Sequence, residues 1–464
     1  MPGLPDDKLD IVRTLVSGAP DSVVSGLRNA LAAAEGDTAL AGVRRVVEAE
    51  VDERKLRNKV MEPVAPLFVG AGDDPERLVF PARALPLLWR GLRAVAPDDV
   101  AQAAMILADY QPGVTSTDAF DRLIERLLEE VDAGDQRDVA SALAVIEAAR
   151  PGGAEVLRSC LAMSRVVRRA TLKLPEWISR TTQERAAAAR LAYRDACRTG
   201  DDLGPRYFDM LGAQLAEPWT ILRIVSAVMD RPAESYLSGS ELAVFALRLM
   251  ATVDANLKVV AGFDLNGGVA AGQAAAAMVE TLTLQISELE NAIDLAREGG
   301  WGGRIQKQKQ TLASVVEGRL RELAKLQNAA LPSQKVRVAR ALVSEPQLSL
   351  PPDARQVERC RSLLAFAEGI RASANYGGFA STRAKVMEAA GEALDQYVED
   401  VLALVRDGEG VDRESAARFL QIAAEFAGWI HEPRASEIVR RRAATAFGAV
   451  KAPRAAWEDP ARAV

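Results

Sequence analysis

Histidine and cysteine are scarce in this 464-residue sequence, which contains one histidine, His431, and three cysteines. A histidine zinc site, a metalloprotease His-Glu-x-x-His motif and a di-iron site with two Glu-x-x-His motifs all need more histidine. Cys160, Cys197 and Cys360 lie far apart and form no Cys-x-x-Cys pair, so neither a disulfide framework nor a thiolate zinc site is indicated. We therefore expect no metal, no cofactor and reduced thiols in the cytoplasm.

Long apolar runs and aromatic residues are also scarce. No segment reaches the ~18 uninterrupted apolar residues of a membrane-spanning helix, and residues 1–8 lack the pattern of a signal peptide. Aromatic residues make up 5% of the chain and the hydrophobic set as a whole 49%, so most apolar side chains are Ala, Leu and Val. This composition favours closely packed helices. The abundance of Ala and Arg is typical of a GC-rich bacterial gene.

Apolar residues recur at helical spacing along most of the chain. Glycine and proline clusters such as Gly18-Ala19-Pro20 and Ala96-Pro97 divide these segments. No stretch of six residues alternates like a strand without fitting a helix equally well. We predict an all-α fold, an elongated multi-helix bundle or irregular helical array, without the fixed signature residues of a repeat family.

Two long helical segments in residues 269–330 are predicted to form the central element of this fold, an antiparallel hairpin. The segments meet at the glycine-rich stretch 298–303, where glycine can adopt the positive φ values of a chain reversal. Lys309 enters the apolar seam of the second segment at one turn. The seam residues are Val279, Leu282, Ile286, Leu289, Ile293 and Ala296 in the first segment and Ile305, Leu312, Val316, Leu323, Leu326 and Ala330 in the second.

Composition divides the chain into three predicted parts. Residues 1–150 form an acidic N-terminal bundle, 151–345 a central module with a basic stretch and the hairpin, and 346–464 a C-terminal bundle with a frayed tail. The first part holds 17 Lys and Arg against 26 Asp and Glu, a balance of −9, whereas residues 151–200 hold 10 against 4, a balance of +6. Such asymmetry indicates an anionic partner or an acidic face elsewhere on the same fold.

The candidate binding residues are therefore basic or aromatic. Nucleic acid is disfavoured as the partner because the whole chain carries −6 and few aromatic residues interleave with the arginines. An acidic protein helix or the acidic N-terminal face of the chain itself is favoured. An ordinary solvated helix face and a hairpin tip that contacts a membrane surface are alternative interpretations. The candidates are Arg165, Arg168, Arg169, Lys173 and Arg180 in the basic stretch, and Trp301 and Arg304 at the hairpin tip.

One acidic motif has a catalytic counterpart in other proteins. The segment Asp6-Asp7-Lys8-Leu9-Asp10 is similar in spacing to the Asp-Asp-x-x-Asp motif with which isoprenoid synthases hold magnesium and diphosphate. It lies at the extreme N-terminus, and the sequence contains no evident second acidic motif. Acidic residues also stabilise the first turn of an ordinary helix, which is the interpretation we favour.

These observations favour a non-catalytic scaffold, adaptor or regulatory protein that binds other proteins through helical surfaces. The alternative is a metal-independent enzyme or regulatory module that binds a small anionic ligand, a nucleotide or a nucleic acid through arginine residues. A closed pocket with converging carboxylates or arginines would favour the alternative, and an exposed apolar surface would favour the scaffold. No catalytic residue is assigned, and the sequence predicts no oligomeric state.

Overall fold

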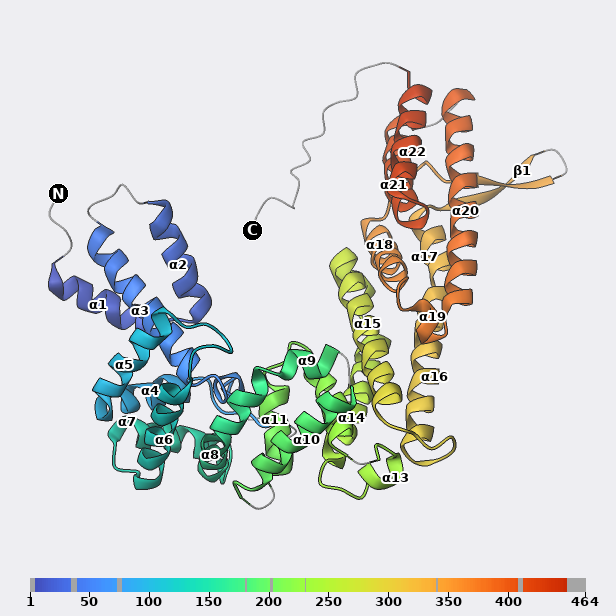
Figure 1. The fold of residues 1–464 in the computed structure, drawn as a ribbon. Coiled ribbons are helices and arrows are strands. Elements are labelled where there is room, and N and C mark those ends of the chain that lie inside the picture. Colours follow the sequence, from blue (N-terminus) through green and yellow to red (C-terminus); the bar gives the residue numbers. More distant parts are fainter. Residues whose placement is uncertain are drawn as a thin grey trace. The chain divides into compact units, whose positions relative to one another are not determined.

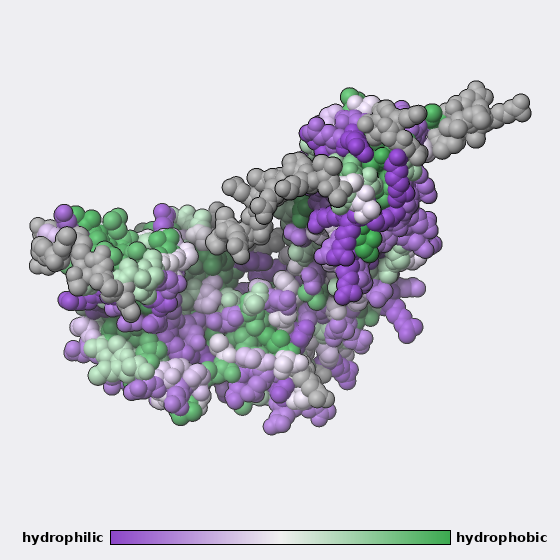
Figure 2. All heavy atoms as spheres, turned by 90° about the horizontal axis from the view of Figure 1, so that it is seen from above, coloured by the Kyte–Doolittle hydropathy of each residue, from purple (hydrophilic) through white to green (hydrophobic). Residues whose placement is uncertain are grey.

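The computed structural model describes residues 5–34, 40–72, 77–179, 182–200, 203–229, 231–338, 341–407 and 412–448. The chain divides into two compact units, Met1–Ala246 and Leu247–Val464, both built almost entirely of helices (Figure 1). The predicted all-α class is therefore confirmed, whereas the division into three parts stays a prediction. On the face of the molecule drawn in Figure 2, hydrophilic and hydrophobic residues are intermingled.

The first unit is a succession of short helices whose ends follow local sequence signals. Pro20 precedes α2, Pro97 begins α5, and Gly134 ends α6 with a φ of 68° that favours glycine. The elements are α1 (Asp6–Gly18), α2 (Asp21–Ala33), α3 (Ala41–Val60), η2 (Ala65–Leu67), α4 (Ala84–Val95), α5 (Pro97–Ala108), α6 (Asp118–Ala133), α7 (Arg137–Ala149), α8 (Gly153–Thr171), α9 (Leu174–Ser179), α10 (Gln183–Cys197), α11 (Gly204–Gly212), η3 (Pro218–Ile221), α12 (Leu222–Val228) and α13 (Glu234–Leu237).

Two arginines of α3 hold the preceding helices. The Arg54 guanidinium donates hydrogen bonds to the carbonyl oxygens of Val16 and Ala19, at 2.9 and 2.8 Å, where α1 ends. Arg44 donates in the same way to the carbonyl oxygens of Leu31 and Ala34, at 3.2 and 3.0 Å, where α2 ends. The Val16 and Leu31 carbonyls also accept from the backbone N–H groups of Ala19 and Ala34, at 3.2 and 3.3 Å, so each arginine adds a second donor at a helix end, where carbonyl groups lack the regular intrahelical bonds. A small aliphatic core of Val16, Val24, Leu31 and Val47 completes the packing.

We expect Arg54→Met to loosen α1 and α2 without unfolding the rest of the chain. The change removes the capping hydrogen bonds at the end of α1, the ion pair with Asp21 at the start of α2, and the ion pair with Glu50, whose oxygen lies 2.7 Å from Arg54 Nε. The local cost should be about 1–2 kcal/mol, since each net hydrogen bond is worth about 1 kcal/mol. Hydrogen exchange should show faster exchange in α1 and α2 alone. Unchanged exchange in both helices would contradict this role for Arg54.

The second unit contains longer helices and one small sheet. Helix α14 (Ala243–Ala261) begins at the boundary between the units. The remaining elements are η4 (Leu265–Gly267), α15 (Gly268–Ala292), α16 (Gly300–Arg321), α17 (Leu323–Ala330), β1 (Ser333–Val338), β2 (Ala341–Pro346), α18 (Ala354–Gly369), α19 (Ala374–Gly377), α20 (Ala380–Asp407), α21 (Arg413–Ile430) and α22 (Pro433–Ala446).

The predicted hairpin at 269–330 is not confirmed as the central element of the chain. Its seam residues are buried, except that Ala296 is exposed beyond the end of α15. Gly299 and Gly300 do have positive φ values, 74° and 51°. Helix α15 packs closely against α18, however, where a Cβ added to Gly272 would lie 2.0 Å from the Ser362 carbonyl oxygen. Lys309 is half-buried and binds Glu290 with an N–O distance of 3.2 Å.

The two-stranded β-ribbon was not predicted from the sequence. Strands β1 and β2 pair antiparallel, from Ser333 opposite Pro346 to Val338 opposite Ala341. Only Lys335-Val336-Arg337-Val338 alternates between polar and apolar residues, which is too short a pattern to distinguish a strand from a helix. In Figure 1 this ribbon projects away from the helices around it.

Candidate binding groove

Arg168 is buried inside the first unit and is fully engaged there. Its side chain is 1% exposed. Its Nε donates to Asp121 Oδ1 at 2.7 Å, and its two terminal nitrogens donate to the carbonyl oxygens of Lys59 and Val60 at 2.8 and 2.6 Å. Asp121 is also buried, so the pair joins α8 to α6 while α3 supplies the carbonyls. In this arrangement Arg168 stabilises the fold, and its guanidinium is not presented at the surface.

Two further basic residues of α8, Arg158 and Arg165, face carboxylates of the same chain. Arg165 lies 3.3 Å from Asp118 and 3.8 Å from Glu125 of α6, and Arg158 forms an ion pair with Asp132 of the same helix. The basic part of α8 is thus matched by the acidic α6. At these positions, the positive charge that follows residue 151 is balanced by an acidic helix face of the same fold. The sequence analysis had given an acidic face of the chain as one of two favoured binding partners for these arginines.

The remaining candidates of the basic stretch lie at or near the surface. Arg169 is exposed and has no ion pair with any residue in the described ranges. Lys173 lies 3.9 Å from Glu176, and both side chains are mostly exposed, so this pair adds little stability. Arg180 lies outside the described residues. The structure thus brings Arg165 and Arg168 together around Asp121 and leaves Arg169 and Lys173 outside that cluster.

Trp301 and Arg304 belong to the second unit. Trp301 lies in the first turn of α16 and is partly buried. Arg304 binds Asp254 of α14 with an N–O distance of 2.6 Å, and Gln308 donates to the other oxygen of Asp254 at 2.7 Å. Burial raises the pKa of Asp254, but hydrogen bonds from Arg304 and Gln308 outweigh this effect and bring the pKa below its ordinary value. Arg304 therefore contributes to the contact between α14 and α16.

The nucleophilic and metal-ligating side chains do not converge in the described part of the chain. Burial raises the pKa of the Cys160 and Cys360 thiols to about 12, which keeps both protonated near neutral pH. His431 follows α21 and lies 3.5 Å from Asp395, with its side chain 40% exposed. Within the described ranges, no three His, Cys, Asp or Glu residues are grouped closely enough to hold a metal ion. No helix in those ranges is long and apolar enough to cross a membrane.

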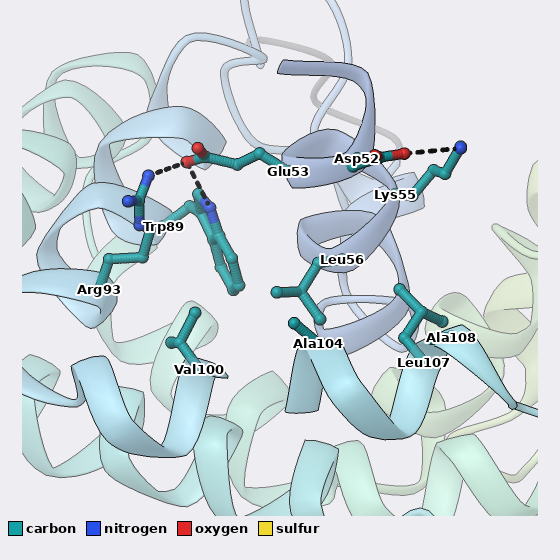
Figure 3. A pocket seen from close by; sticks show the side chains of 10 residues that line it. All are labelled: Asp52, Glu53, Lys55, Leu56, Trp89, Arg93, Val100, Ala104, Leu107 and Ala108. Atoms are coloured by element: carbon teal, nitrogen blue, oxygen red, sulfur yellow. Dashed lines mark hydrogen bonds and ion pairs between the residues drawn. The ribbon is translucent and has the colours of Figure 1, made fainter. Parts of the chain in front are cut away.

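A groove of about 570 Å³ opens between α3, α4 and α5 in the first unit (Figure 3). Apolar side chains from all three helices form its floor, including the buried Leu56 and Trp89. On α5 the lining residues are spaced at positions i, i+4, i+7 and i+8, which places them on one face of that helix. The groove is lined by Asp52, Glu53, Lys55, Leu56, Trp89, Arg93, Val100, Ala104, Leu107 and Ala108.

The charged residues of the groove neutralise one another. Glu53 accepts a hydrogen bond from Trp89 Nε1 at 3.1 Å and also binds Arg93, as the dashed lines in Figure 3 show. Lys55 binds Asp52 at 2.8 Å. Both cations are thus matched by carboxylates in the groove itself. A small anionic ligand would have to compete with these carboxylates, whereas an apolar side chain could occupy the floor without breaking either pair.

The sequence did not reveal this groove. Leu56 and Trp89 belong to ordinary helical patterns, and each such pattern indicates only that one helix face is covered. The groove exists because three helices leave space between their faces, and the periodicity of one helix does not specify where its neighbours end. The one available signal was Ala104 and Ala108, two small residues one turn apart on a helix that also carries large aliphatic residues.

Comparison with known proteins does not identify a family. No protein-family model matches the chain, and no curated protein or solved structure shows significant similarity to it. The assignment of function therefore rests on the geometry of the chain itself.

Proposed function

We propose that this chain is a non-catalytic scaffold, adaptor or regulatory protein that binds other proteins, and that the groove between α3, α4 and α5 receives a helix from a partner. The observation that supports this most directly is the apolar floor of the groove, bordered by ion pairs that are already complete. Burying apolar surface is the main favourable contribution to protein association. A cytoplasmic location belongs to the same proposal.

A helix fits this groove better than an extended peptide. An extended peptide gains affinity by pairing with the open edge of a sheet, and the groove walls are helices whose backbone groups are bonded internally. A helix instead inserts apolar side chains spaced at i, i+3, i+4 and i+7 into an apolar groove. Ala104 and Ala108 leave room for such a helix to approach α5 closely, because their side chains are small.

The alternative function, binding of a small anion through arginines, has less support. Arg165 and Arg168 are neutralised by α6 carboxylates, and Arg304 is neutralised by Asp254. An anion at any of these positions would have to displace a carboxylate that is part of the fold. The apolar groove needs no such displacement.

Site-specific photocrosslinking tests the proposal. A photoreactive residue at Ala108 should crosslink in cells to an amphipathic segment of another polypeptide, and the crosslink should be lost when Ala104→Arg fills the groove. Ala104 is exposed, so this change should alter stability by no more than about 0.5 kcal/mol. Met105→Arg is the matched control, since Met105 is 69% exposed on the same helix and does not line the groove. Equal crosslinking from Ala108 in the wild type and in Ala104→Arg would overturn the proposal.

A further inference from the structure

The β-ribbon of the second unit extends beyond the helices that anchor it (Figure 1). Its base is closed by the Gln347 N–H, which donates to the Pro332 carbonyl oxygen at 2.9 Å. Leu331 and Leu348, next to these residues in the chain, are buried, whereas Lys335 further along β1 is exposed. A ribbon of two strands without further covering is only marginally stable in water. The ribbon therefore gains stability from any additional strand pairing.

The connection between the two strands is short. Strand β1 ends at Val338 and β2 begins at Ala341, and these residues are paired in the ladder, so only the two residues between them join the strands. Two-residue connections between antiparallel strands favour type I′ and II′ turns, which need positive φ values and therefore Gly, Asn or Asp. The sequence has Ala339 and Arg340 at these positions, and positive φ values are costly for both residue types because of the Cβ atom. The sequence thus disfavours closing the hairpin within one chain.

A second copy of the chain removes this conflict. If residues 333–346 are extended throughout, they can pair antiparallel with the same segment of a second copy and keep every pairing of the present ladder. Val336 then pairs with Val343 of the second copy, just as it pairs with Val343 of its own chain in the closed ribbon. Ala339 and Arg340 become two further paired residues in the middle of the ladder. No reversal is needed, because each chain crosses from one molecule to the other.

The helices that follow the ribbon can cross over with β2. Helix α20 contacts the helices that precede the ribbon: Gln327 of α17 donates to the Ala390 carbonyl oxygen at 2.9 Å, and Thr382 donates to Glu317 of α16 at 2.7 Å. In an exchanged pair the same contacts form between the two copies, because the exchanged elements are identical. An extended segment 333–346 spans about 45 Å at about 3.3 Å per residue, which separates the two anchoring sets of helices. The exchange therefore needs no new contact between helices.

We propose that two copies of this chain exchange β2 and the helices after it, and form a twofold dimer through a continuous antiparallel ladder of residues 333–346. Short connections under strain favour such an exchange over the closed hairpin. Both copies contribute the same segment, so the assembly closes at two chains and does not grow into a filament. The inference concerns the second unit alone and does not depend on the groove of the first.

Sedimentation analysis of purified full-length protein tests this inference. Exchange requires the second unit to open, so the protein is first incubated in urea just below its unfolding midpoint and then returned to buffer. The wild type should be largely dimeric after incubation at ~100 µM and monomeric after incubation at ~1 µM, because association follows mass action. Ala339→Asn/Arg340→Gly supplies the residues of a type I′ turn and should lower the dimer-to-monomer ratio about tenfold or more. Arg340→Gln is the matched control: it removes the same charge without adding a turn residue, and it should dimerise like the wild type.

Paired cysteines distinguish exchange from other kinds of association. Gln334 and Glu345 are opposite each other in the ladder. The variants Gln334→Cys and Glu345→Cys, each combined with Cys197→Ser to remove the exposed native thiol, are incubated together in the same urea. Exchange places the new cysteine of one variant opposite that of the other. Oxidation should therefore give a covalent dimer from the mixture and none from either variant alone.

Three results would overturn the inference. The first is a wild type that remains monomeric after incubation at ~100 µM, a range in which weak specific complexes already form. The second is an Ala339→Asn/Arg340→Gly variant that dimerises like the wild type, because the turn would then have no influence on association. The third is a dimer in the mixture of cysteine variants that oxidation does not crosslink, which would mean that the copies associate without exchanging strands.

Discussion

Replacing Arg168 with methionine is expected to lower the free energy of unfolding of the first unit by about 3–5 kcal/mol. The substitution leaves the buried Asp121 carboxylate without its main cation, and the carbonyl oxygens of Lys59 and Val60 lose a donor. Removing one partner of a buried ion pair is costly because the remaining charge has lost its hydration and its counter-charge. Urea denaturation followed by circular dichroism would measure the effect.

Two further variants show whether the buried charge is the cause. Arg169→Met changes the adjacent, exposed residue and should alter stability by no more than about 0.5 kcal/mol. The double variant Asp121→Leu/Arg168→Met removes both charges and should recover much of the loss, because an apolar pair of similar volume carries no desolvation penalty. A double variant that is as unstable as the sum of both single changes would contradict this explanation.

Alanine at position 272 is expected to destabilise the second unit by about 2–4 kcal/mol. The added Cβ would lie 2.0 Å from the carbonyl oxygen of Ser362 and 3.1 Å from the backbone nitrogen of Phe366. These are backbone atoms of α18, so the clash cannot be relieved by rotating a side chain, and the two helices must move apart. Differential scanning calorimetry should show a lower transition temperature for Gly272→Ala.

The matched control is the same substitution in α16. At Gly318 an added Cβ meets no atom within 4 Å, and alanine is a better helix former than glycine by about 0.5–1 kcal/mol. Gly318→Ala should therefore stabilise the protein, so the two glycine-to-alanine changes should have opposite signs. If both changes stabilise the protein, α15 and α18 are not as close as this structure places them.

Much of the fold could be predicted from the sequence because local signals determine most of it. Pro97 and Gly134 mark helix ends through their own backbone preferences. The excess of positive charge after residue 151 pointed to an acidic counterpart, and part of that counterpart is α6. The spacing of apolar residues did not show which helix packs against a given helix face. From the sequence, we predicted that the apolar seam of α15 packs against the next helix in the chain, α16. In the structure, α18 packs against the part of α15 that contains Gly272.

The candidate site was less predictable for a related reason. The sequence analysis selected arginines as candidate binding residues because of their charge. Charge alone does not distinguish an arginine that binds a partner from an arginine that is buried against a carboxylate of the same chain. Arg168 and Arg169 are neighbours in sequence, and the structure buries the first and exposes the second. The groove depends on the distances between three helices, to which no single sequence pattern corresponds.

The caps that α3 supplies should also affect how α1 and α2 fold during synthesis. Helices α1 and α2 have 13 residues each, a length at which an isolated helix is marginal in water. Arg54 lies 38 residues after the Val16 carbonyl that it caps. The ribosome must therefore release most of α3 before the first two helices acquire their stabilising partner. Helices α1 and α2 should consequently be accessible to chaperones and proteases until α3 has emerged, and they should become protected in one step when it does.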